Sequence, residues 1–129
     1  MKKILFILCI CVSFGVFSTT SYAGKCEGGV EFPGLVNNHT YCRSKVGMTW
    51  WAAFAWCKKQ GRELASVKQI CDSNGATSAG QCDNVAEGVM GWLWSANPKS
   101  STSAFRISKE TGSIQGGNVN DTNQVAICY

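Results

Sequence analysis

The predicted fold depends most on one stretch of the sequence, Thr49-Trp50-Trp51-Ala52-Ala53-Phe54-Ala55-Trp56-Cys57-Lys58-Lys59-Gln60-Gly61. It predicts a short helix that begins at the capping side chain of Thr49 and ends at Gly61, which adopts left-handed backbone easily. The spacing i, i+3, i+4, i+7 predicts one buried face, formed by Trp50, Ala53, Phe54 and Cys57. Because most other positions are apolar too, we expect a core helix that other elements wrap.

A secretory leader is predicted before this helix. Residues 1–23 begin with Met1-Lys2-Lys3, continue with an apolar run from Ile4 to Phe17, and end with the small-x-small pattern Ser21-Tyr22-Ala23. This order is typical of a bacterial signal peptide, and the apolar run is shorter than the about 20 residues of a membrane span. We therefore expect a single mature domain at 24–129, without a membrane span, that is secreted or periplasmic.

The charge pattern argues against a nucleic-acid partner. The formal net charge is +4 at pH 7, and two of the basic residues are Lys2 and Lys3 of the predicted leader. The remaining lysines and arginines are scattered along the chain. Nucleic-acid binding requires a concentrated basic patch that neutralises phosphates, and the sequence shows no such patch.

Six cysteines follow residue 23. An even number in an oxidising compartment predicts three disulfides. A zinc site is disfavoured because the chain has no C-x-x-C motif and only one histidine, His39. Six cysteines allow fifteen connectivities, among which short loops favour two local pairs and leave one pair that closes a long loop. The pairs expected on this ground are Cys26–Cys42, Cys71–Cys82 and Cys57–Cys128.

The rest of the chain predicts an α+β fold. A ribbon is expected from Gly24 to Ser44, and a second helix from about Val67 to Ser73, begun by the capping box Ser66-Val67-Lys68-Gln69. Alternating apolar residues predict strands at 90–95, 104–108 and 124–129, and in the first of them Trp92 and Trp94 share one face. Two helices followed by antiparallel strands are typical of the α+β class.

Taken together, these features resemble the C-type lectin-like domain family. The features are the cysteine ribbon from Cys26 to Cys42, residues 48–67, the aromatic strand Gly91-Trp92-Leu93-Trp94-Ser95 and the closing strand Val125-Ala126-Ile127-Cys128-Tyr129. The resemblance implies a compact, disulfide-stapled fold with two helices and a small antiparallel sheet. In this fold the closing strand's cysteine bonds back to the first helix. It also implies a binding module for a glycan or a protein surface, adhesin-like or part of a surface assembly.

The chain departs from the calcium-binding members of that family. Those members carry Glu-Pro-Asn or Gln-Pro-Asp in the long loop and Trp-Asn-Asp on a later strand, whereas this chain has Ala96-Asn97-Pro98 and Val119-Asn120-Asp121. Calcium takes six to eight oxygen ligands, several of them carboxylates. Asp121 is the only acidic residue after Glu110, so we expect no metal and no cofactor.

The resemblance also implies where a ligand binds. In this family the ligand usually meets the irregular loops between the central strands, which here are residues 95–103 and 116–123. Short polar side chains in these loops can donate and accept hydrogen bonds, and Trp94 can offer an aromatic face. The expected ligand-binding residues are Trp94, Asn97, Lys99, Asn118, Asn120, Asp121 and Asn123. The alternative is that tight turns need Asn and Gly at these positions.

No catalytic set can be assembled from the sequence. His39 has no evident catalytic partner, and the acidic residues are dispersed rather than paired. We therefore expect a protein that is not an enzyme. An alternative to the recognition module is a small periplasmic or secreted inhibitor or structural accessory protein that binds no carbohydrate. The sequence leaves the ligand and the oligomeric state open.

Overall fold

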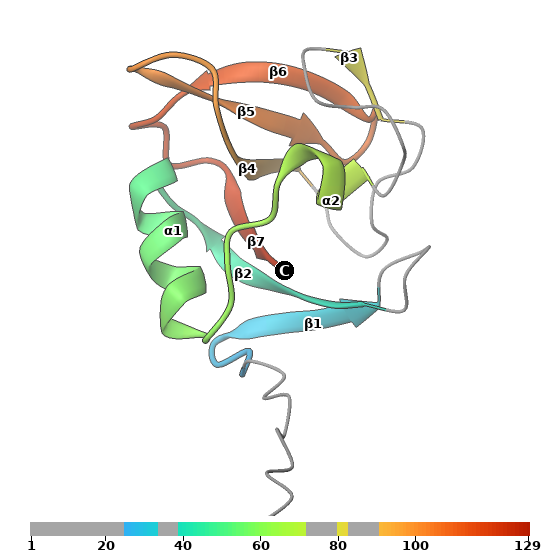
Figure 1. Ribbon diagram of the computed structural model, residues 1–129, viewed down its shortest axis with the longest axis vertical. Coiled ribbons are helices and arrows are strands. Elements are labelled where there is room, and N and C mark those ends of the chain that lie inside the picture. The colour runs from blue at the N-terminus through green and yellow to red at the C-terminus, as the bar shows by residue number, and fades with distance from the viewer. Residues whose placement is uncertain (1–24, 34–38, 72–79, 83–90) are drawn as a thin grey trace, which may run out of the picture.

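The computed structural model describes residues 25–33, 39–71, 80–82 and 91–129, so the predicted leader lies outside the described residues. The chain is of the α+β class, as predicted (Figure 1). Neither described helix has the length and hydropathy needed to cross a membrane. The elements in chain order are β1 (Gly29–Pro33), β2 (Thr40–Gly47), α1 (Trp50–Lys59), α2 (Val67–Cys71), β3 (Gly80–Gln81), β4 (Trp92–Pro98), β5 (Ser103–Ser108), β6 (Ser113–Asn118) and β7 (Val125–Cys128).

The strands form one mixed sheet in the order β1-β2-β7-β4-β5-β6-β3. β4 and β7 run parallel, with Trp94 beside Ala126, whereas the other pairs in the described sheet are antiparallel. The expectation of a purely antiparallel sheet is therefore wrong. Parallel neighbours need a long connection, and here the β5–β6 hairpin and residues 119–124 supply it. These residues carry the chain back to the start of β4, so that β7 enters the sheet in the direction of β4.

The two helices cover opposite faces of the sheet. Neighbouring side chains on a strand point to opposite faces, and Leu93 and Trp94 of β4 are both fully buried. Leu93 packs in a cluster with Val67 of α2. Trp94 packs in a second cluster with Ala53 of α1. The domain therefore has two cores, one on each side of the sheet.

Helix α1 begins and ends where the sequence predicts. Thr49 Oγ1 accepts a hydrogen bond from the Ala52 amide (3.2 Å), and Gly61 has a φ of 70°. The buried residues of the helix are Trp50, Ala53 and Cys57. Phe54, which was predicted to be buried, is 37% exposed. This part of the prediction is wrong because the sheet covers α1 from one side only, so that a single narrow stripe of the helix is buried.

The capping box at the start of α2 is confirmed. Ser66 Oγ accepts from the Gln69 amide (3.2 Å), and Gln69 Oε1 accepts from the Ser66 amide (2.8 Å). The hydroxyl of Tyr41 in β2 donates to the Gln69 carbonyl (2.7 Å) and holds the helix against the sheet. The described part of α2 ends at Cys71, and the predicted extension to Ser73 lies outside the described residues.

The three disulfides have the predicted pairing. They are Cys26–Cys42, Cys57–Cys128 and Cys71–Cys82, with sequence separations of 16, 71 and 11. The disulfide with the largest separation joins α1 to β7, the last strand in the chain, and so holds the helix against the middle of the sheet. Disulfides persist in oxidising compartments, which is compatible with a secreted or extracellular protein.

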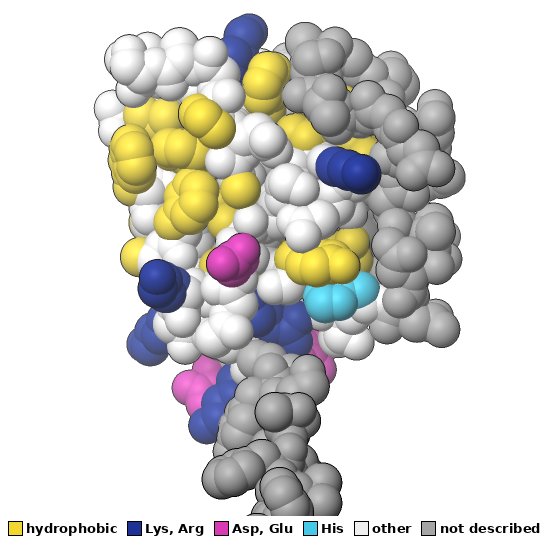
Figure 2. Space-filling model, in the orientation of Figure 1, with side chains coloured by type: hydrophobic (Ala, Val, Ile, Leu, Met, Phe, Trp, Pro, Cys, Tyr) yellow, Lys and Arg dark blue, Asp and Glu magenta, His cyan; other side chains and the backbone are white. Residues whose placement is uncertain are grey.

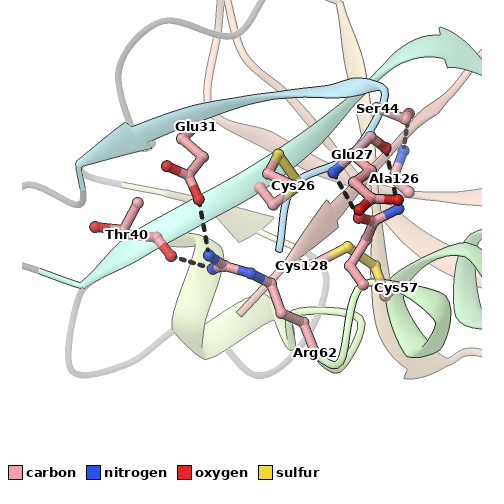
Figure 3. Close-up of a disulfide and its surroundings, with 11 residues drawn as sticks. Cys26, Glu27, Glu31, Thr40, Ser44, Cys57, Arg62, Ala126 and Cys128 are labelled. Atoms are coloured by element: carbon pink, nitrogen blue, oxygen red, sulfur yellow. Dashed lines mark hydrogen bonds and ion pairs between the residues drawn. A yellow bond between two sulfur atoms is a disulfide. The ribbon is translucent and has the colours of Figure 1, made fainter. Parts of the chain in front are cut away.

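The ribbon formed by β1 and β2 is tied to the end of α1 by side chains (Figure 3). The side-chain amide of Gln60 accepts from the Glu27 amide (2.7 Å) and donates to the Glu27 carbonyl (3.1 Å). The guanidinium of Arg62 donates to the Thr40 carbonyl and pairs with the Glu31 carboxylate (3.2 Å). The ribbon is therefore held to the end of α1 by hydrogen bonds, and within the ribbon the Cys26–Cys42 disulfide joins the residues before β1 to β2.

Candidate functional site

The outward side of α1 presents two aromatic rings to solvent. Trp51 is 59% exposed and Phe54 is 37% exposed. Both rings contact the ring of Trp50 edge to face, with centroid distances of 4.7 and 4.9 Å. Trp50 is itself buried, and its indole nitrogen donates to the Ser95 carbonyl (2.7 Å). The two exposed rings are therefore held in place by a ring that is anchored in the core.

These rings lie on α1 together with two further exposed apolar residues, Ala52 and Ala55. Figure 2 shows hydrophobic side chains gathered on the side of the molecule where Figure 1 places α1. Single exposed apolar residues are common on soluble proteins, but adjacent large ones more often mark an interaction site. Trp51 and Phe54 are adjacent because residues three apart on a helix lie on neighbouring turns.

Residues 119–124 lie against the start of α1. The Trp50 amide donates to the Val119 carbonyl (2.9 Å), and the Met48 amide donates to the Gln124 carbonyl (2.8 Å). A Cβ atom on Gly47 would lie 2.2 Å from the Thr122 carbonyl oxygen, so this close approach requires glycine. The loop between β6 and β7 therefore wraps the first turn of the helix.

Four of the seven predicted ligand-binding residues lie in or beside this loop. They are Asn118, Asn120, Asp121 and Asn123, of which the three asparagines are exposed. Asn118 shapes the turn, because its Oδ1 accepts from the Asn120 amide (3.0 Å) and its backbone carbonyl accepts from the Asp121 amide (2.9 Å). Trp51, Phe54, Asn120 and Asn123 are all exposed, and the loop that carries the two asparagines is bonded to the start of the helix that carries the two rings. These four residues are called the aromatic-loop face below.

The other three predicted residues do not belong to this surface. Trp94 is fully buried beneath α1, and its indole nitrogen donates to the Met48 carbonyl (2.8 Å). Asn97 lies in β4, where its Oδ1 accepts from the Val67 amide (2.8 Å) at the start of α2, across the sheet. Both were assigned to a binding surface because the sequence does not show which face of β4 each helix covers.

Lys99 lies in the β4–β5 turn, and its side chain does not extend over the α1 side of the sheet. A Cβ atom on Gly116 would lie 2.7 Å from Lys99 Cδ, so the lysine stem crosses that glycine. Gly116 is paired with Phe105, which packs against the core cluster on the α2 side. The Lys99 side chain therefore extends along the opposite side of the sheet from α1.

Arg106 fixes the loop to the sheet. Its guanidinium lies 4.5 Å from the centroid of the Trp92 ring and 3.8 Å from the Asp121 carboxylate. The only acidic group of the loop is therefore paired with an arginine. Within the described ranges, no cluster of three or more histidine, cysteine or acidic residues is arranged to hold a metal ion.

His39 has a packing role in the structure. Its ring stacks on Tyr129 with a centroid distance of 3.7 Å and an interplanar angle of 17°, and it meets Tyr41 edge to face at 5.4 Å. Burial lowers the pKa of His39 below its ordinary value of 6.5, and the nearby positive charge of Arg62 lowers this pKa further. Neutral imidazole is therefore the form that the fold favours.

Sequence reasoning missed the aromatic half of the site. Trp51 falls outside the i, i+3, i+4, i+7 stripe of α1, which was a sign that it faces outward. Phe54 falls on the edge of that stripe, and only the tertiary arrangement shows that it is exposed. Comparison with protein-family models, with curated proteins and with solved structures finds no match to this chain.

Proposed function

We propose that this chain is a secreted recognition module, without catalytic activity, that binds carbohydrate on the aromatic-loop face. The observation that carries the proposal is the exposure of Trp51 and Phe54 beside a loop rich in asparagine. Neither ring is needed to fill a core, because Trp50 and Trp94 already occupy the space between α1 and the sheet.

This combination of groups suits a sugar. A pyranose ring has an apolar C–H face, which stacks on an aromatic ring, and a rim of hydroxyls, which needs directed donors and acceptors. Asparagine amides provide both kinds of hydrogen-bonding group, and ligand sites commonly join aromatic surface to a few polar groups. Contact with the buried Trp50 ring restrains Trp51 and Phe54 before binding, which reduces the entropy lost when a ligand is held.

The resemblance to C-type lectin-like domains supports a binding role, although fold alone does not assign function. The family's disulfide from the first helix to the closing strand corresponds to Cys57–Cys128, and its ribbon disulfide corresponds to Cys26–Cys42. The proposed binding is independent of calcium, because calcium sites use several carboxylates, whereas Asp121 is the only acidic residue at positions 116–123 and is paired with Arg106.

A glycan array tests the proposal. The oxidised protein is applied with and without a chelator, beside the variants Trp51→Ala and Val30→Ala. Val30, on edge strand β1, is 38% exposed and serves as a control for the loss of exposed apolar surface. We expect binding to selected glycans that the chelator leaves unchanged, that Trp51→Ala abolishes and that Val30→Ala retains. The proposal would be overturned if the protein bound no glycan, or if Trp51→Ala and Val30→Ala lost glycan binding equally.

A further inference from the structure

We infer that the carbohydrate carries an anionic group, and that Lys58 on α1 binds this group. The inference rests on the proposed function and adds the charge of the ligand to it. Lys58 lies seven residues after Trp51 and four after Phe54. At 3.6 residues per turn, these three residues form one stripe along the outward side of the helix.

Helix geometry places the lysine within reach of the same ligand. Seven residues span about 10.5 Å along a helix axis, and long helical side chains project back over the preceding turn. The ammonium of Lys58 therefore extends from the last turn toward Phe54 and Ala55, both of which are exposed. A ligand longer than one sugar ring can stack on Trp51 and still reach this ammonium.

The charges of the surrounding surface favour an anion. Helix α1 contains no acidic residue, and both Lys58 and Lys59 in its last turn are exposed. Asp121 in the adjacent loop is paired with Arg106. Glu63, the next acid after the helix, lies beyond Gly61, where its amide and carbonyl bond to Tyr129. Figure 2 shows basic side chains at the end of α1 below the hydrophobic area, with acidic side chains among them. One exposed acid at this end is Glu27, which Gln60 holds there and which is paired with Lys25 (3.5 Å).

A carbohydrate fits this surface better than an anionic membrane does. The two exposed rings contact a buried ring and lie in the first half of a helix that packs on the sheet. Insertion of the rings into lipid would give the side-chain amides of Asn120 and Asn123 no hydrogen-bond partner on the ligand. Sugar hydroxyl groups, in contrast, form hydrogen bonds with such amides directly. The anionic group itself can be a carboxylate or a sulfate, because a lysine ammonium attracts either one as a point charge and donates hydrogen bonds to its oxygens.

The chain offers a matched control for Lys58. Lys59 is the next residue, carries the same charge and is also exposed. One residue is a rotation of about 100° around the helix, so Lys59 projects beside the stripe rather than along it. The variants Lys58→Gln and Lys59→Gln have the same net charge and change the last turn equally.

The experiment compares acidic sugars with their neutral counterparts. Titration calorimetry with the oxidised protein uses an oligogalacturonate and its carboxyl-reduced form, and a sulfated galactan oligosaccharide and its desulfated form. We expect at least one acidic form to bind about tenfold more tightly than its neutral form. Lys58→Gln should weaken that binding about fivefold or more and leave the neutral form unchanged, whereas Lys59→Gln should change it by less than about twofold.

Three results would overturn the inference. One is equal affinity for the acidic and neutral forms, which leaves carbohydrate binding itself intact. Another is an equal effect of the two lysine variants, which indicates general attraction rather than a contact at Lys58. The third is binding to phosphatidylserine vesicles but to none of the sugars. Absence of binding to all sugars on the glycan array overturns the proposed function instead.

Discussion

Helices α1 and α2 pack on opposite faces of the same sheet, but they use their residues differently. In α2 all the aliphatic residues are buried, and the exposed position is occupied by Lys68. In α1 the inward stripe is also buried, but the outward side carries Trp51 and Phe54. Packing explains every apolar residue of α2, whereas two aromatic residues of α1 exceed what packing requires.

This difference separates residues that fold the domain from residues available for binding. Both helices rest on a sheet and both are joined by a disulfide to another element, α1 to Cys128 of β7 and α2 to Cys82. Among the residues that the structure describes, a polar loop wraps the first turn of α1, through the bonds of Met48 and Trp50 to residues 119–124, and none wraps that of α2.

The largest loss of stability is expected for Trp94→Ala. The side chain is fully buried under α1, and its removal leaves a large cavity and an unpaired Met48 carbonyl. Such truncations cost about 3–5 kcal/mol in the free energy of unfolding. Urea denaturation measures this loss. A loss below about 1 kcal/mol would show that Trp94 is not a core residue and would reopen its role in binding.

The disulfides of the two helices should contribute unequally to the free energy of unfolding. The chain-entropy relation gives about 4 kcal/mol for a loop of the length closed by Cys57–Cys128 and about 3 kcal/mol for the Cys71–Cys82 loop. The double variant Cys57→Ser with Cys128→Ser should therefore unfold at lower urea concentration than Cys71→Ser with Cys82→Ser. The reverse order would indicate that α2, rather than α1, is the helix that holds the domain together.

Asn97→Ala should cost about 1 kcal/mol, because it removes an acceptor for the Val67 amide at the start of α2. Asn120→Ala is the matched control on the exposed loop and should change the free energy of unfolding by less than about 0.5 kcal/mol. Urea denaturation of both variants measures the difference. Equal losses would contradict the assignment of Asn97 to the fold and Asn120 to the surface.

Stability should fall as the solution becomes mildly acidic. The pKa of His39 is lowered in the folded protein, so the unfolded chain binds a proton more readily near pH 6.5. The stabilisation is complete above pH 6.5 and is lost as the pH falls through the lowered pKa. The measurement is the urea midpoint between pH 7.5 and 5.0, where His39→Gln should show a smaller pH dependence than the wild type.

Glu110 also contributes a pH dependence to stability, but at a lower pH than His39. Its pKa is also lowered, since its carboxylate accepts a hydrogen bond from the Gly91 amide, so its contribution is lost only below about pH 4.5. A wild-type midpoint that is constant from pH 7.5 to 5.0 would contradict the packing role of His39.

The sequence was sufficient for the elements that local signals define. The caps at Thr49 and Ser66 and the closing strand depend on residues close together in the chain, and loop lengths favoured the disulfide pairing that the structure has. The parallel pairing of β4 with β7 could not be predicted, because it depends on the path by which residues 119–124 return the chain to the start of β4. For the same reason the exposure of Phe54 and the burial of Trp94 were missed, since each depends on which side of the sheet α1 occupies.

The central claim is that Trp51 serves binding and not folding, and one comparison tests it directly. The dissociation constant of Trp51→Ala for the best array glycan is measured beside its urea midpoint. The account predicts a midpoint within about 1 kcal/mol of wild type, because Trp51 is 59% exposed, and an affinity at least about tenfold weaker. An unchanged affinity, or a loss of stability as large as that of Trp94→Ala, would contradict it.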